Sequence, residues 1–333
     1  MTTTTRPSLL LLLVLTFAPA AWAQPAPIGG LGGQQTGDAL ATPGPYGVRV
    51  GDLAWVDAAR QGRRIDVRIY EPVGLRAGSP LVVFSHGLGG DHTGYAYIGE
   101  HLASHGLTAV HLNHPGSDSV VRQQGYLALV RAGMDLQNRL DRPKDVSFVL
   151  DEVRRTQRAE PLLDQVDLTK IAVAGHSFGA YTALAVVGQT FVEAGQTYSF
   201  RDRRVRCAVA MSPQGPGTIG LTEESWDGVR APVHTMTGTE DTGLGTDDVA
   251  DRRAAFDAMP PGDKHHLTIE GAEHSAFGDR FDKDRDPRHH GWILAATTGF
   301  LRATLLDDRA AAQWLERGQL QRDTRGEVVQ ERR

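Results

Sequence analysis

Several short segments of this chain are apolar along their whole length, and stretches of helical periodicity separate them. Residues 79–85 (SPLVVFS), 107–113 (LTAVHLN) and 170–177 (KIAVAGHS) show this pattern first. A strand that is apolar on both faces belongs in a sheet that is covered on both sides. Strands of a sheet with one solvent-exposed face instead alternate apolar and polar residues. Strands that alternate with helices predict a mostly parallel central sheet in one α/β domain, with helices on both faces. Further strands are expected at 207–213, 231–238 and 265–274, and helices at 93–106, 120–158, 179–189, 250–259 and 292–306.

The predicted domain extends over residues 46–306 and opens with an antiparallel hairpin. Residues 47–57 and 63–72 alternate apolar and polar side chains. They flank a turn at residues 60–62. Alternation of this kind on both sides of a short turn is typical of two paired antiparallel strands.

The two ends of the chain are expected to lie outside this domain. Residues 24–45 are rich in Gly and Pro and have no periodic apolar pattern, which predicts a flexible leader. Residues 307–333 predict one amphipathic helix, with Trp314 and Leu315 packed inward, and then a polar, frayed tail.

The first 23 residues have the layout of a secretory signal peptide. One positive charge at Arg6 precedes an apolar run, and Ala-Trp-Ala before Gln24 is a small-x-small cleavage site. A membrane anchor is the alternative, but the apolar run is short and Pro19 interrupts it. We therefore expect an exported protein, periplasmic or secreted, that is cleaved near Ala23 and keeps no membrane-spanning segment.

Composition narrows the classes of function. A net charge of −5 provides no basic surface of the kind that nucleic-acid binding requires. The single cysteine, Cys207, cannot form an intramolecular disulfide, and its apolar surroundings predict a small core residue rather than a reactive thiol. No cysteine or carboxylate shares a ligand spacing with the histidine pairs, so we expect no metal site and no cofactor.

The segment Gly175-His176-Ser177-Phe178-Gly179 is the candidate catalytic motif. A buried strand precedes it and a helical run follows it. Small residues on both sides of a serine allow the chain to turn sharply from strand to helix, which leaves the hydroxyl exposed above the sheet. We therefore predict that Ser177 is a nucleophile.

A serine nucleophile needs backbone donors for the oxyanion, and the segment SHGLGG (residues 85–90) follows an earlier strand. Glycines there allow the backbone to approach a substrate closely. The N–H groups of Leu88 and Phe178 are the predicted oxyanion donors. His86, Gly87 and Gly89 are predicted to belong to the binding loop, with His86 as a structural hydrogen bonder beneath it rather than as a base. A plain glycine turn is the alternative for this segment.

The catalytic base is expected after Ser177, because enzymes with a serine in this strand–turn–helix motif carry their catalytic residues in the order serine, acid, histidine. His274 is the last residue of the predicted strand, where the chain enters the loop of GAEHSAFGD, and from there its side chain can reach across the sheet edge. Four of the other histidines after Ser177 lie inside a predicted strand or at the start of the last helix: His265, His266, His289 and His290.

The acid is expected at the end of the strand before His274. Two adjacent carboxylates stand there, and the spacing from Gly238 favours Asp241 as the residue that orients the imidazole, with Glu240 as the alternative. The other strand end able to supply an acid has Ser212 in that position, which strengthens the prediction of Asp241.

Residues 116–140 form the one sizeable stretch between a strand and its main crossover helix. They follow the carboxyl end of a strand, which is the edge where α/β sheets bind ligands. We expect them to form part of the rim or lid of the binding pocket, or else an ordinary surface insertion.

Taken together, these motifs resemble the α/β-hydrolase superfamily over roughly residues 46–306. SHGLGG, NHPGSD, RPKDVSFVLDE and GHSFGAYTA look like the dienelactone-hydrolase-like and platelet-activating-factor-acetylhydrolase-like group. Dienelactone hydrolases proper use a cysteine nucleophile, whereas this chain has Ser177. The acetylhydrolases carry their acid at the earlier strand end, where this chain has Ser212, and cutinase-like polyesterases carry theirs after the later strand.

What this resemblance implies is cofactor-free hydrolysis of carboxylic esters through an acyl-enzyme. The substrate is then a small-molecule, lipid or polymer ester, and polyesterase and phospholipid acetylhydrolase activities are the alternatives within this class. A peptidase would use the same triad, and a haloalkane dehalogenase would need an aspartate at position 177. A non-catalytic binding protein of the same fold is the alternative from another class, although such proteins usually lose a triad member.

Overall fold

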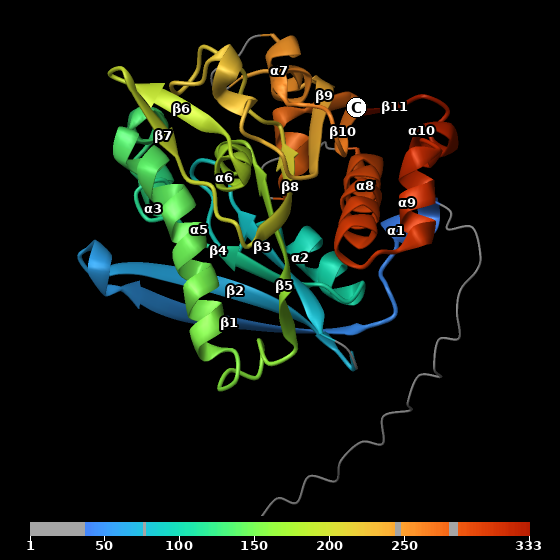
Figure 1. The fold of residues 1–333 in the computed structure, drawn as a ribbon, viewed down its shortest axis with the longest axis horizontal. Coiled ribbons are helices and arrows are strands. Elements are labelled where there is room, and N and C mark those ends of the chain that lie inside the picture. Colours follow the sequence, from blue (N-terminus) through green and yellow to red (C-terminus); the bar gives the residue numbers. More distant parts are fainter. Residues whose placement is uncertain (1–36, 76–77, 244–247, 280–285) are drawn as a thin grey trace, which may run out of the picture. The chain divides into compact units, whose positions relative to one another are not determined.

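The computed structural model describes residues 37–75, 78–243, 248–279 and 286–333, and the predicted signal peptide and most of the predicted leader lie outside these ranges (Figure 1). Nine strands form one sheet, in the order β1-β2-β4-β3-β5-β8-β9-β10-β11. All pairs from β4 to β10 are parallel, while β1–β2, β2–β4 and β10–β11 are antiparallel. The strands are β1 (Gly47–Asp57), β2 (Arg63–Val73), β3 (Ser79–Ser85), β4 (Thr108–Leu112), β5 (Val166–His176), β8 (Val205–Met211), β9 (Val233–Glu240), β10 (Lys264–Glu273) and β11 (Val328–Arg332).

Helices cover both faces of this sheet, as the doubly apolar strands predict. Successive side chains of a strand point to opposite faces. Leu81 and Val83 of β3 therefore pack in one core with α5 (Leu136–Thr156), α6 (Phe178–Val187) and α7 (Ala250–Ala258). Val82 and Phe84 pack in a second core on the other face, with α2 (Ala96–Ser104), α8 (Pro287–Leu305) and α9 (Arg309–Glu316). The mostly parallel α/β architecture with its N-terminal hairpin is confirmed.

Both ends of the described chain are more ordered than the composition predicts. Within the expected leader, Gly37–Ala41 form α1, and the Leu40 side chain is fully buried in the core that contains α8. The expected frayed tail instead forms α10 (Gln319–Asp323) and β11, which pairs with β10 and buries Val328. The leader supplies Leu40 to the core, and the C-terminal segment supplies Leu320 and Val328.

A few further elements complete the description. The strands β6 (Thr190–Glu193) and β7 (Gln196–Ser199) form a separate hairpin that the sequence pattern does not predict. Two short helices precede α5, namely α3 (Ser119–Gln123) and α4 (Tyr126–Met134). The single-turn 3₁₀ helices are η1 (Ala58–Arg60), η2 (Glu223–Trp226) and η3 (His274–Phe277).

The helix α5 begins earlier than its proline suggests. Asp135 caps it by accepting a hydrogen bond from the Gln137 N–H, so Pro143 lies inside the helix rather than at its start. A proline has no N–H to donate to the carbonyl four residues earlier, which here belongs to Arg139. The Tyr181 hydroxyl of α6 donates to that carbonyl at 3.0 Å. A contact between two helices thus replaces the hydrogen bond that the proline removes.

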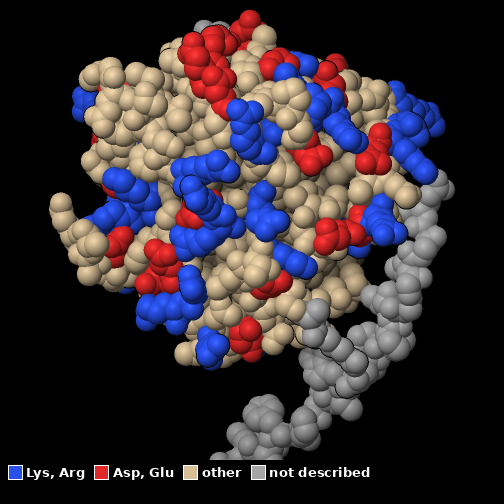
Figure 2. All heavy atoms as spheres, in the orientation of Figure 1, with Lys and Arg blue, Asp and Glu red and all other residues tan. Residues whose placement is uncertain are grey.

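Charged side chains of both signs share the surface. On the face that Figure 2 shows, Lys and Arg lie among Asp and Glu. None of the helices in the described ranges is long and apolar enough to cross a membrane. Cys207 is fully buried in β8, and burial raises the pKa of its thiol to about 12, so this thiol stays protonated near neutral pH.

Burial holds the pKa of many histidines below the ordinary value near 6.5, so these imidazoles are neutral in the folded protein. His101 and His111 are examples, each with its pKa lowered to about 4. In the unfolded chain the same groups would titrate near pH 6.5. The full set is His86, His101, His105, His111, His114, His176, His234, His265 and His266.

Acidification from pH 6.5 towards pH 4 is therefore expected to destabilise the fold. In that window the unfolded chain binds protons that the folded protein does not, so the free energy of unfolding falls by about 1.4 kcal/mol per pH unit for each such histidine. Urea unfolding at several pH values measures the slope. Replacing His101 by Gln keeps a group that can hydrogen-bond to the Leu40 carbonyl but removes one titrating imidazole. The free energy of unfolding should then change with pH less steeply, by the contribution of one proton. An unchanged slope in this variant would contradict the conclusion that His101 stays neutral in the folded protein over this pH range.

Candidate active site

Ser177 lies in a sharp turn between β5 and α6. Its backbone angles, φ 56° and ψ −118°, are rare for a residue other than glycine. A Cβ atom at Gly175 would overlap the Gly179 carbonyl oxygen, and one at Gly179 would overlap the Ser85 carbonyl oxygen. Both glycines of the motif are thus required by close backbone packing, which holds Ser177 in this conformation.

Replacing Gly179 by Ala tests this packing. The added methyl group would force α6 away from β3, so we expect a loss of about 3 kcal/mol or more in the free energy of unfolding, together with loss of the turn geometry. Gly291, inside α8, is the matched control because its added Cβ would come no closer than 3.9 Å to Ala41. Gly291→Ala should be neutral or stabilising by up to about 1 kcal/mol. Equal effects of the two substitutions, measured by chemical denaturation, would contradict this interpretation.

A cavity of about 770 Å³ opens beside Ser177. Its described lining comes from the loop after β3, the turn after β5, the end of β9 and the start of η3. These are the carboxyl ends of parallel strands, the edge where α/β sheets bind ligands. The lining residues include Gly87, Leu88, Asp91, Tyr95, His176, Ser177, Glu240, Glu273, His274 and Asp279.

His274 lies directly after β10 and lines the same cavity as Ser177. Its Nδ1 is 2.8 Å from the Asp241 Oδ1 atom. Its Nε2 is buried and has no hydrogen-bond partner among the described residues. Glu240, the alternative acid, is exposed and lines the cavity instead. An imidazole held by a carboxylate on one nitrogen can accept a proton on the other.

The Asp241 carboxylate is fully buried and well supplied with partners. Burial by itself would raise its pKa, but the hydrogen bond from His274 and the charge of Arg252 outweigh burial and hold the pKa below its ordinary value. Arg252 Nε is 3.5 Å from Oδ1, and the Thr237 hydroxyl donates to Oδ2 at 2.9 Å. Asp241 is therefore ionised near neutral pH.

Ser212 is a further member of this cluster that the sequence did not identify as a contact. It directly follows β8 and has a left-handed φ of 55°. Its hydroxyl donates to Asp241 Oδ1 at 2.8 Å and lies 2.7 Å from His274 Nδ1. The ends of β8 and β9 thus converge on one imidazole nitrogen, and either strand end is placed to carry an acid.

This convergence predicts that the carboxylate beside His274 can be moved from position 241 to position 212. Asp241→Asn should lower kcat by about 10⁴-fold, because the imidazole loses the carboxylate that orients it. Adding Ser212→Asp to that variant should raise kcat again by at least about tenfold, because the new carboxylate can reach His274 Nδ1. The measurement is ester turnover by folded protein, with Ser212→Asn as the uncharged control. A double variant no more active than Asp241→Asn alone would contradict the convergence.

The predicted oxyanion donors lie on two neighbouring segments. Leu88 lines the cavity. The Phe178 N–H is the first of α6, a position that has no partner within a helix. Gly89 has φ +74°, and its N–H donates to the Ser117 carbonyl at 2.9 Å, which fixes the loop.

The remaining predicted loop residues divide into two kinds. Gly87 lines the cavity, and its N–H donates to the Tyr95 hydroxyl at 3.2 Å. His86 is buried beneath the loop, with its Nδ1 2.7 Å from the Gly87 carbonyl oxygen and its Nε2 accepting the His114 N–H. Burial holds the pKa of His86 well below its ordinary value, so it is neutral. Neither His86 nor Gly89 is among the described lining residues.

His176 and Tyr95 are cavity residues that the sequence analysis did not assign. The Tyr95 hydroxyl lies 2.8 Å from His176 Nδ1 and also accepts the Gly87 N–H, so it ties the loop after β3 to the turn after β5. The His176 and His274 rings are 4.8 Å apart. His176 occupies the variable position before the serine, and only its place in the motif could have pointed to it.

Residues 116–140 pack against the binding loop without lining the described cavity. Leu129 of α4 is close to Gly89, and Leu88 is close to Gly133. The outer side of α4 leaves Tyr126 and Leu127 exposed to solvent. This segment therefore supports the loop from outside.

Comparison with known proteins supports the fold. A family model described as the alpha/beta hydrolase fold matches residues 80–237. This match covers a little under half of the chain and, together with the observed fold, supports membership of the α/β-hydrolase superfamily. Among the described residues, no group of His, Cys, Asp and Glu side chains is arranged to hold a metal ion.

Its similarity to individual proteins is more distant. The chain is 31% identical over 171 residues to the platelet-activating factor acetylhydrolase of Canis lupus familiaris and 32% identical over 171 residues to that of Bos taurus. Each match covers 41% of this chain and 36% of the relative. The Cavia porcellus acetylhydrolase is 28% identical over 163 residues. The chain thus spans little more than a third of the length of these relatives.

Proposed function

We propose that this protein is a serine hydrolase that cleaves carboxylic esters, with Ser177, His274 and Asp241 as its catalytic triad. The observation that carries the proposal is the hydrogen bond from His274 to the ionised Asp241, which leaves an unpartnered Nε2 on an imidazole that lines the same cavity as Ser177. A hydrolase fold and acetylhydrolase relatives support ester hydrolysis.

The reaction proceeds in two halves. The Ser177 hydroxyl attacks the ester carbonyl carbon while His274 Nε2 takes its proton. The resulting oxyanion accepts hydrogen bonds from the Leu88 and Phe178 N–H groups. As the tetrahedral intermediate collapses, His274 returns the proton to the leaving alcohol and the acyl group stays on Ser177. Water then repeats the sequence, releases the carboxylic acid and regenerates the serine.

Short acyl esters are the first substrates to test. The relatives are named acetylhydrolases, and a cavity of about 770 Å³ is large enough for a drug-sized ligand. Phospholipid acetyl esters are the alternative substrates within this class, and the similarity to these relatives is the reason to test them. A non-catalytic binding protein is disfavoured because a residue suited to each catalytic role is present. We further propose that residues 1–23 direct export and that the mature chain begins at Gln24.

The proposal predicts that Ser177→Ala abolishes ester turnover. Removing the nucleophile should lower kcat/KM for p-nitrophenyl acetate and butyrate by at least about 10³-fold while the protein remains folded. Ser199→Ala, on the exposed strand β7, is the matched control and should keep full activity. Comparing acetate, butyrate and octanoate esters then defines the preferred acyl length. Folded wild-type protein that turns over none of these esters would favour the non-catalytic alternative.

A further inference from the structure

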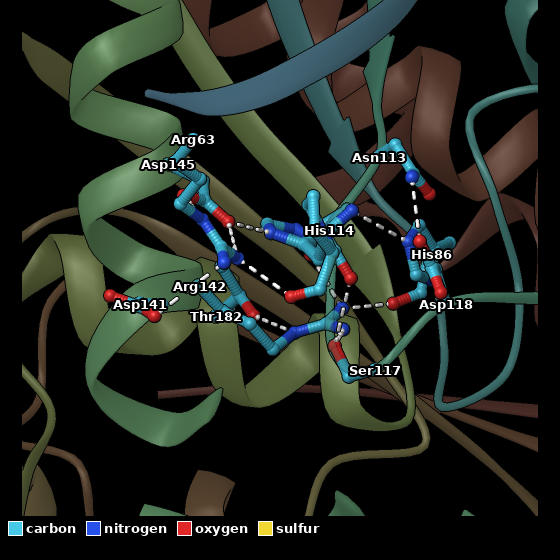
Figure 3. A network of polar contacts seen from close by, with 12 residues as sticks. Arg63, His86, Asn113, His114, Ser117, Asp118, Asp141, Arg142, Asp145 and Thr182 are labelled. Carbon is cyan, nitrogen blue, oxygen red and sulfur yellow. Dashed lines mark hydrogen bonds and ion pairs between the residues drawn. The ribbon is translucent and has the colours of Figure 1, made fainter. Parts of the chain in front are cut away.

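Arg142 of α5 is a fully buried cation beside the proposed active site. It donates to the Ser117 hydroxyl at 2.8 Å, the Thr182 hydroxyl at 3.0 Å and the Ser85 hydroxyl at 3.1 Å. It also donates to the His86 carbonyl oxygen, and Figure 3 shows the surrounding network of polar contacts. Within the described part of the chain it makes no ion pair with a carboxylate. Such a charge is costly to bury, so its retention calls for a role beyond packing.

Most of the groups that Arg142 contacts belong to the two segments that carry the proposed oxyanion donors. The His86 carbonyl is two residues before Leu88, at the end of β3. On the other side, the guanidinium lies 4.5 Å from the centre of the Phe178 ring. Thr182 extends this second contact, because its hydroxyl also donates to the Phe178 carbonyl at 3.0 Å. One side chain therefore fixes two segments that are 90 positions apart in the sequence.

A third segment is held through Ser117. Its hydroxyl accepts from Arg142, and its carbonyl accepts the Gly89 N–H at 2.9 Å. Gly89 follows Leu88 directly, so Arg142 restrains the donor loop on both sides of Leu88. The burial that makes this charge costly also lowers its pKa, but only to about 9, so the guanidinium remains charged at neutral pH.

A buried chain of hydrogen bonds sets the orientation of the Ser85 hydroxyl. Ser85 Oγ is 2.9 Å from His114 Nε2, and His114 Nδ1 is 2.9 Å from Asp145 Oδ2. Burial, reinforced by Arg142 and Arg63, holds the pKa of His114 well below its ordinary value, so this imidazole is neutral. Its Nδ1–H then donates to Asp145, its Nε2 accepts the Ser85 proton, and the Ser85 lone pairs face Arg142.

Ser85, His114 and Asp145 are the same residue types as the proposed catalytic triad. Here the serine hydroxyl is hydrogen-bonded to the imidazole, whereas His274 Nε2 has no hydrogen-bond partner among the described residues. All three side chains are fully buried, and none lines the described cavity beside Ser177. Asp145 also accepts hydrogen bonds from Arg60 and Arg63, which neutralise its charge. This second Ser–His–Asp arrangement has no access to substrate and is suited only to holding its neighbours.

We propose that Arg142 is the positioning residue of the oxyanion site: it fixes the Leu88 and Phe178 amides relative to each other and is itself oriented by the Ser85–His114–Asp145 chain. The inference rests on the proposed serine-hydrolase function. Arg142 does not touch the substrate, so its loss affects the transition state through the two amides and leaves substrate binding largely intact.

The test compares Arg142→Lys with Arg139→Lys in the full chain. Arg139 lies one turn earlier on α5, is also buried, and contacts Phe191, the Ile219 carbonyl and Glu193 instead of the donor segments. The readouts are kcat and KM for p-nitrophenyl butyrate, and Ki for a trifluoromethyl ketone. That ketone forms a hemiketal with Ser177, whose oxyanion requires the same two amides.

Arg142→Lys should lower kcat at least about 30-fold with KM within threefold, and should weaken ketone binding by the same factor as kcat. Arg139→Lys should change each quantity less than threefold. If Arg142→Lys does not fold, Thr182→Val and Thr182→Ser replace it: the valine variant should lower kcat about tenfold, and the serine variant, which keeps the hydroxyl, should retain activity.

Two outcomes overturn the proposal. One is an Arg142→Lys variant, or a Thr182→Val variant in its place, that keeps wild-type kcat and ketone affinity while the wild-type protein hydrolyses the ester. The other is an equal loss in Arg142→Lys and Arg139→Lys, which would indicate general damage to α5. Wild-type protein with neither turnover nor ketone binding would overturn the proposed function as well, so the two failures are distinguishable.

Discussion

The close approach of α6 to the end of β3 sets the geometry of the whole site. Gly179 packs against the Ser85 carbonyl with no room for a side chain, so the first turn of the helix lies directly on the neighbouring strand end. That contact forces Ser177 into its left-handed turn. It also brings the Phe178 amide next to the loop that carries Leu88. Nucleophile and proposed oxyanion donors thus depend on one backbone contact.

Buried charge has two different uses in this molecule. Asp241 is ionised and adjoins an imidazole that lines the cavity and whose other nitrogen is unpartnered, an arrangement suited to proton transfer. Asp145 is bonded to another imidazole, but arginines surround it and the partner hydroxyl is buried. The two Ser–His–Asp sets therefore differ in solvent access and charge environment rather than in residue type. Residue type alone therefore does not distinguish a catalytic set from a positioning set.

Much of the architecture could be predicted because it depends on local patterns. Strands that are apolar on both faces reveal the parallel sheet, and the rule that ligands bind at the carboxyl ends of such strands indicates Ser177, Asp241 and His274 as candidates. These three candidates remain a prediction about function, but the fold now brings Asp241 and His274 into contact and places His274 in the cavity that Ser177 lines.

Other features depend on contacts between distant segments, and sequence patterns do not contain that information. The polar C-terminal tail becomes β11 because β10 offers an open edge and Val328 fills a core position. Arg142 lies in a segment expected to be helical, and Tyr181 satisfies the carbonyl that Pro143 leaves without a donor. Its role depends on three loops that only the fold brings together.

The most direct test of the central claim is a crystal structure of the protein after reaction with a fluorophosphonate. The account predicts one covalent adduct, on Ser177 Oγ, with the phosphonyl oxygen within about 3 Å of both the Leu88 and Phe178 backbone nitrogens. His274 should remain bonded to Asp241 and face the leaving-group side. An adduct on another residue, or a phosphonyl oxygen that points away from both amides, would contradict the account.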